Sequence, residues 1–182
     1  MTNQIYSEEK LTIGHVVEYY NDSLEAIKLL EEKVENEEPP HLNKFIGATK
    51  QEVKEAFEIQ RRELKYNANF NLIAATEASL KIDFDKRVNR GRKGSDQMNR
   101  EFLKIYQENN RKISLENHIL EQWKLFKNEE RVVFSKFKGL LKYRNWLAHG
   151  RYWEPNLSQD NIDFLEVHLI CNAVDEVINT NK

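Results

Sequence analysis

The sequence contains few residues that end helices or cross-link loops: three prolines, six glycines and one cysteine among 182 residues. The lone Cys171 excludes an internal disulfide framework. No apolar run approaches the roughly 20 residues that a bilayer-spanning helix requires, which excludes an integral membrane protein of that kind. The polar start of the chain has no apolar signal core, so we expect a soluble protein of the cytoplasm.

Patterns that bind metals or nucleotides are also missing. The sequence has neither a Cys-x-x-Cys pair nor a His-Glu-x-x-His motif, and its five histidines are scattered. The basic loop at residues 91–94 contains two glycines but lacks the strand-to-helix setting of a phosphate-binding loop. We therefore expect no metal site and no organic cofactor.

The residues that are present favour long helices. Glu, Lys, Leu and Asn are abundant, and apolar residues recur at three- and four-residue spacing. We expect helices at residues 7–36, 49–84, 96–106, 114–127, 128–149 and from about 160 to the end. This pattern predicts an all-α, up-and-down bundle of about five to six helices, two of them long. The chain length suits one domain, 1–182, with residues 1–48 as a helical extension of uncertain role.

Several helix ends have sequence signals. Thr49 and Glu52 form a capping-box pattern, and Gly150 stands where a helix end favours a left-handed residue. Pro39 and Pro40 follow the first expected helix and prevent its continuation. Two later helix starts have two candidate caps each: Ser95 or Asp96, and Ser158 or Asp160.

The charge is unevenly distributed along the chain. Residues 131–153 contain no acidic side chain, although the net charge of the whole sequence is −2. Basic and aromatic residues alternate in this stretch, among them Phe134, Phe137, Tyr143, Trp146, Tyr152 and Trp153. The mixture is typical of surfaces that bind a polyanion with stackable bases, whereas the alternative is an ordinary solvated helix face.

Two of the expected apolar helix faces contain a charged residue. Glu77 falls in line with Ile73 and Leu80, and Arg144 falls in line with Leu140 and Leu147. A buried charge without a partner costs several kcal/mol, so we predict that Glu77 and Arg144 meet between the two helices. Such a pair either sets the helix register or orients the guanidinium for phosphate binding.

Residues 143–152 resemble the signature of the HEPN superfamily, an arginine, a polar residue, three variable residues and a histidine. Arg144, Asn145 and His149 occupy these positions. The segment from Glu77 to Phe84 is similar to the Glu-bearing helix of the RiboL-PSP-HEPN branch. The resemblance extends over roughly residues 66–177 and implies a HEPN-like helical fold.

The resemblance implies a metal-independent endoribonuclease, often a toxin or an antiviral defence effector. It also implies a homodimer with a composite active site and RNA as the substrate. For a toxin it further implies an antitoxin or sensor protein that restrains the enzyme. We expect Lys142, Arg151 and Tyr152 to contribute to RNA binding.

The residue types suit this chemistry. We assign Arg144 to phosphate binding and His149 to proton transfer, because arginine keeps its charge and histidine titrates near neutral pH. Asn145 is expected to hydrogen-bond the phosphate or fix the His149 ring, and Glu77 to support Arg144. Two alternatives stay open: a non-catalytic helical dimerisation or interaction module, and an RNA-binding module that cleaves nothing.

Overall fold

The computed structural model describes residues 9–37, 41–93, 96–109, 112–153 and 162–181, and in these residues it contains helices and no strands. The predicted all-α bundle is confirmed. The six α-helices are α1 (Ile13–Glu35), α2 (Lys50–Gly91), α3 (Gln97–Glu108), α4 (Leu120–Phe126), α5 (Arg131–Ala148) and α6 (Phe164–Thr180). A 3-10 helix, η1 (His41–Phe45), precedes α2, and a π-helical turn, η2 (Leu115–Ile119), leads into α4.

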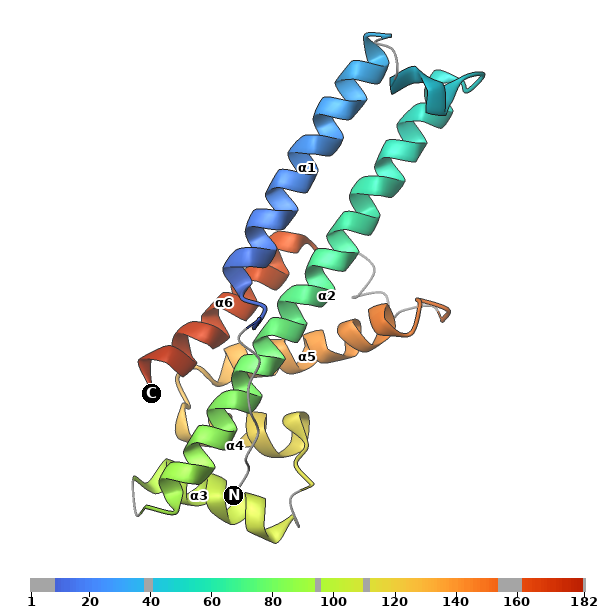
Figure 1. Ribbon diagram of the computed structural model, residues 1–182. Helices are drawn as coiled ribbons and strands as arrows, with labels where there is room; N and C mark the ends of the chain where they lie inside the picture. Colours follow the sequence, from blue (N-terminus) through green and yellow to red (C-terminus); the bar gives the residue numbers. More distant parts are fainter. Residues whose placement is uncertain (1–8, 38–40, 94–95, 110–111, 154–161, 182) are drawn as a thin grey trace.

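The long helix α2 is the axis of the molecule. It has 42 residues, which corresponds to about 60 Å at 1.5 Å per residue. Figure 1 shows α1 running antiparallel to the first half of α2 as a projecting arm, while the other helices gather around the second half. None of the described helices combines the length and apolar character needed to cross a membrane.

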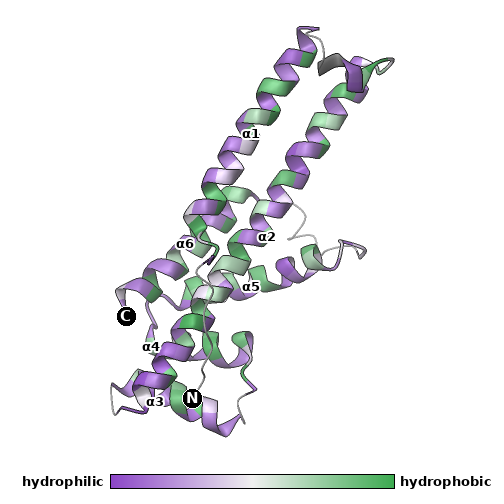
Figure 2. Cartoon of the chain, in the orientation of Figure 1, coloured by the Kyte–Doolittle hydropathy of each residue, from purple (hydrophilic) through white to green (hydrophobic). Residues whose placement is uncertain are grey.

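Burial along α2 follows this division. Phe57 is the only buried residue of α2 before Ala68, whereas 13 of the 24 residues from Ala68 to Gly91 are buried. Figure 2 accordingly shows hydrophobic residues collected where α2 meets α4, α5 and α6, and a more mixed surface on the arm. The first turns of α1 pack on the core. Val16 is buried, and the Tyr20 ring stacks on Phe164 with 3.8 Å between ring centroids. Residues 13–35 thus pack on the bundle at one end and project from it at the other.

Side-chain caps fix several helix ends. The capping box at Thr49 is confirmed, since its backbone N–H donates to Glu52 at 2.7 Å and its hydroxyl accepts from the Glu52 N–H at 3.2 Å. The Glu52 carboxylate accepts from both the N–H and the hydroxyl of Thr49, and these two hydrogen bonds lower the pKa of Glu52. Of the two candidates before α3, Asp96 is the cap, because its carboxylate accepts from the Asn99 N–H at 2.9 Å. Ser95 lies outside the described residues.

Some predicted boundaries differ from the structure. The N-cap of α6 is Asp163, and the two residues proposed for that position, Ser158 and Asp160, lie outside the described residues. Thr12 caps α1, so the helix begins later than the predicted start near Ser7, a residue that also lies outside the description. Pro39 and Pro40 are likewise undescribed. The helix predicted from residue 128 begins three residues later, because residues 128–130 form a turn.

The second long helix continues to Gly91, seven residues beyond the predicted end near Phe84. The reason is the buried Arg87, whose Nε donates to Asp83 Oδ2 at 2.6 Å and whose Nη2 donates to the Asn181 carbonyl at 2.7 Å. Its guanidinium also lies 4.6 Å from the Trp123 ring centroid. Burial raises the pKa of Asp83, and the hydrogen bond from Arg87 opposes that rise. The last turns of α2 are therefore held by α4 and by the end of α6.

Two helical glycines provide a matched test of the contact between α2 and α3. A Cβ at Gly91 would lie 2.4 Å from the backbone oxygen of Asn99, whereas a Cβ at Gly139 in α5 meets nothing within 4 Å. We expect Gly91→Ala to lower the free energy of unfolding by about 1–3 kcal/mol through overpacking. Gly139→Ala should raise it by about 0.5–1 kcal/mol, because alanine favours the helix. Urea titration followed by circular dichroism measures both, and two changes of the same sign would contradict the close packing at Gly91.

Candidate functional site

The Glu77–Arg144 contact predicted from the sequence is confirmed. Arg144 Nε in α5 donates to Glu77 Oε1 in α2 at 2.7 Å, and Arg144 Nη2 donates to the same oxygen. The Glu77 side chain is 8% exposed and that of Arg144 is 29% exposed, so the pair lies at the edge of the core. Lys81 Nζ lies 3.6 Å from the other Glu77 oxygen. The carboxylate therefore holds the guanidinium from the buried side and leaves its opposite edge toward solvent.

Asn145 completes this group. Its Oδ1 accepts a hydrogen bond from Arg144 Nη1 at 2.8 Å. The guanidinium thus uses one N–H on each of its three nitrogens within the protein. Because arginine has five N–H donors, the remaining ones are available to an anion at the partly exposed edge. The arrangement is a fixed cation with its orientation set on two sides.

His149 lies at the C-terminal cap of α5, and its side chain is exposed. The prediction that Gly150 ends this helix is confirmed. Gly150 has φ +76°, its N–H donates to the Leu147 carbonyl, and the Arg151 N–H donates to the Trp146 carbonyl at 3.1 Å. This is the Schellman pattern of hydrogen bonds. It turns the chain sharply just after the histidine.

The structure brings together three of the predicted catalytic and supporting residues and sets the fourth apart. Glu77, Arg144 and Asn145 form one hydrogen-bonded group. The His149 ring instead lies beside Trp153, with 5.9 Å between ring centroids. Arg144 faces α2, while His149 occupies the helix end, as expected for residues five apart on a helix. Both face solvent in part, but from different sides of α5.

The turn after His149 is fastened to the bundle. Arg151 donates to both carboxylate oxygens of Glu63, at 2.7 and 2.9 Å, and its guanidinium lies 4.9 Å from the Tyr66 ring centroid. The hydrogen bond to Glu63 raises the pKa of Arg151. The Trp146 Nε1–H also donates to the Trp153 carbonyl at 2.9 Å. The predicted RNA-binding residue Arg151 thus has an internal partner, and nothing near it in the sequence indicates Glu63.

The aromatic residues of the basic stretch divide into two groups. Four of them are buried in the core, namely Phe134, Phe137, Tyr143 and Trp146. Tyr152 and Trp153 are exposed, by 82% and 37%. Lys142 is also exposed. Burial raises the pKa of Tyr143, partly opposed by a hydrogen bond from Asn69, so this phenol stays protonated near neutral pH.

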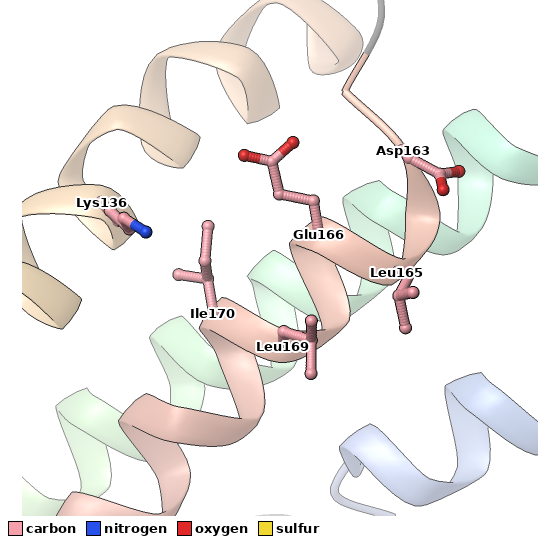
Figure 3. A pocket seen from close by; sticks show the side chains of 6 residues that line it. All are labelled: Lys136, Asp163, Leu165, Glu166, Leu169 and Ile170. Atoms are coloured by element: carbon pink, nitrogen blue, oxygen red, sulfur yellow. The ribbon is translucent and has the colours of Figure 1, made fainter.

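Other chemistry-bearing groups lie away from this region. The described residues contain no cluster of three His, Cys, Asp or Glu side chains that would hold a metal ion. Burial raises the pKa of the Cys171 thiol to about 12, which makes it a poor nucleophile. Figure 3 shows an open hollow between α5 and α6, with Lys136 facing Glu166 and Ile170. None of the predicted site residues lines it.

A double-mutant cycle tests the Glu77–Arg144 contact. We expect Glu77→Gln and Arg144→Lys each to lower the free energy of unfolding, with a coupling of about 1–3 kcal/mol. The first change removes the anion that faces the guanidinium, and the second replaces its two donors to Glu77 by one ammonium group. Lys81→Gln is the control, since its exposed end interacts weakly with Glu77 and should change stability by less than about 1 kcal/mol. Additive effects of the two changes would show that the residues do not interact.

Comparison with known proteins finds no match to this chain: no family model, no curated protein and no solved structure. The fold and the contacts of residues 143–153 are therefore the available basis for a function. The resemblance of Arg144, Asn145 and His149 to the HEPN signature remains a resemblance of sequence.

Proposed function

We propose that this protein is a metal-independent endoribonuclease of the HEPN type, in which Arg144 binds the scissile phosphate and His149 transfers a proton. The observation that carries the proposal is the fixed Glu77–Arg144–Asn145 group on the same helix end as the exposed His149. A guanidinium held from behind by a carboxylate presents its free N–H groups without the entropy cost of a mobile side chain. This is the property that phosphate binding requires.

The reaction uses the nucleophile that RNA already carries. The 2′-hydroxyl oxygen attacks the adjacent phosphorus after a base removes its proton. The bond from phosphorus to the 5′-oxygen breaks, and an acid gives that oxygen a proton. The products are a 2′,3′-cyclic phosphate and a 5′-hydroxyl end. Histidine suits either proton transfer near neutral pH, and Arg144 offsets the charge that develops on the phosphate oxygens.

The different directions of Arg144 and His149 favour a composite site. One protomer does not bring the two side chains together, because they leave the helix about 140° apart. In a homodimer that joins the ends of two α5 helices, one His149 acts as the base and the other as the acid. Lys142 and Tyr152 extend the same region and would contact the RNA strand. We infer a toxin or antiviral defence effector in the cytoplasm, restrained by an antitoxin or sensor protein.

A second function is favoured by the same ion pair. Glu77 accepts hydrogen bonds from two of the three Arg144 nitrogens, so the pair also suits a purely structural role between α2 and α5. In that case the protein is a helical interaction or RNA-binding module without turnover. In that case His149→Ala would not differ from wild type in RNA cleavage, because neither protein would cleave.

The test is cleavage of total RNA in EDTA by wild type, His149→Ala and Arg144→Ala. We expect each variant to lose cleavage by about 100-fold or more, because general acid–base catalysis and phosphate binding both act in the transition state. His15→Ala is the control, since this histidine is exposed on α1 and belongs neither to the Glu77–Arg144–Asn145 group nor to the turn after α5. Fragment ends are identified by their sensitivity to phosphatase and kinase treatment.

The possible results separate the two functions. Cyclic phosphate ends, produced by wild type and His15→Ala alone, support the endoribonuclease. Ends with a 5′-phosphate, or equal cleavage by all four proteins, would reject the mechanism. Absence of cleavage together with RNA binding would favour the non-catalytic module.

A further inference from the structure

The two exposed aromatic residues after α5 form a pair of their own. The Tyr152 and Trp153 rings meet edge to face, with 4.6 Å between centroids and 88° between planes. Trp153 is also the neighbour of His149, at 5.9 Å between ring centroids. The three rings therefore form a continuous row that begins at the histidine and ends in solvent. Exposed aromatic surface of this kind is costly in water unless a ligand covers it.

The backbone that presents these rings is held in place at several points. The Schellman bonds at Gly150, the Trp146 bond to the Trp153 carbonyl and the Arg151–Glu63 pair all act on residues 150–153. Arg151 adopts φ +58°, a left-handed conformation that a residue other than glycine adopts only when its surroundings require it. An unfastened turn would let the aromatic side chains fold onto the surface. Here the backbone that carries both rings is held in place, and both rings are exposed.

The surroundings indicate the chemistry of the ligand. Lys142 is exposed on α5 seven residues before His149, which places it on the same side of the helix about two turns away. The partly exposed Arg144 is a second cation, on another side of α5. The other aromatic residues of this stretch are buried and unable to accept a ligand ring. Cations next to exposed aromatic rings are the combination with which proteins bind single-stranded nucleic acid. A base in a duplex is already stacked on both faces and does not reach such a ring.

We propose that Tyr152 and Trp153 form a stacking platform for one unpaired base of the RNA, beside the His149 of the same protomer in the composite site. The inference rests on the proposed function and narrows its substrate class to single-stranded RNA. The platform is a positioning element: it fixes the nucleotide beside the histidine and takes no part in proton transfer. Arg151 contributes by holding the turn through Glu63.

The test measures binding separately from cleavage. A labelled random-sequence RNA pool with 2′-O-methyl groups, which block the attacking hydroxyl, is titrated with the full-length protein as a single strand and as a duplex. We expect wild type to bind the single strand more tightly. Tyr152→Ala should weaken that binding on the order of tenfold, which corresponds to one lost stacking contact. Tyr152→Phe keeps the ring and should retain most of the affinity.

Two controls distinguish stacking from other effects. Tyr19→Ala removes another exposed tyrosine side chain, on α1, and should not change the affinity. The salt dependence of binding should be the same for wild type and Tyr152→Ala, because the number of phosphate contacts is unchanged. Trp153→Leu is a second variant of the platform, and it keeps the backbone carbonyl that Trp146 contacts.

Cleavage of the unmodified single strand by wild type is measured in parallel. Suppose that wild type cleaves RNA, but Tyr152→Ala and Trp153→Leu bind the methylated single strand as tightly as wild type does. The stacking proposal is then contradicted, and the endoribonuclease proposal is retained. Equal affinity for duplex and single strand also overturns the platform. If the variants lose binding while wild type leaves RNA intact, the platform is supported and the endoribonuclease is not. Absence of RNA binding by wild type would reject both proposals and would favour a protein as the partner of the aromatic pair.

Discussion

The burial of one face of α2 along its second half is the constraint on which the other elements depend. From Ala68 onward this helix provides the shared packing surface for α3, α5 and α6. Some of its buried polar residues are paired within the helix, as Asp83 is with Arg87, and others find partners in neighbouring helices. Arg144 in α5 donates hydrogen bonds to Glu77, and the Asn181 carbonyl at the end of α6 accepts one from Arg87. The candidate site is therefore anchored through Glu77 to the helix that contributes the most buried residues to the described structure.

The sequence predicted those features whose physical cause is local or periodic. A capping box needs only Thr49 and Glu52, and a helix stop needs only Gly150 at the right position. The Glu77–Arg144 contact was also predictable, because a charge in line with apolar residues needs a partner and each helix offered one such charge. The all-α class followed from the repeated three- and four-residue spacing. The assignment of an activity to Arg144, Asn145 and His149 remains a proposal.

Features that depend on contacts between distant segments were not predictable. The extension of α2 to Gly91 depends on Arg87 meeting Asn181, and the fastening of residues 150–153 depends on Glu63. In each case the partner is 88 or more residues away, and its sequence neighbourhood carries no sign of the contact. The division of the aromatic residues into buried and exposed sets has the same origin. Spacing placed Trp146 and Trp153 in one basic stretch, but the direction of the chain after Gly150 decided which one faces solvent.

The late position of α6 in the chain has a consequence for synthesis. Two hydrogen bonds join α2 to the residues that flank α6, from Asn69 to Ile162 and from Arg87 to Asn181, and their partners lie 93 and 94 positions apart. At ordinary rates of translation, about 5–20 residues per second, the apolar face of α2 leaves the ribosome roughly 5–20 seconds before the helix that covers it. During that interval Leu72 and Ile73, fully buried in the finished protein, have no cover from α6. The nascent chain is thus a natural client for chaperones that bind exposed apolar helices.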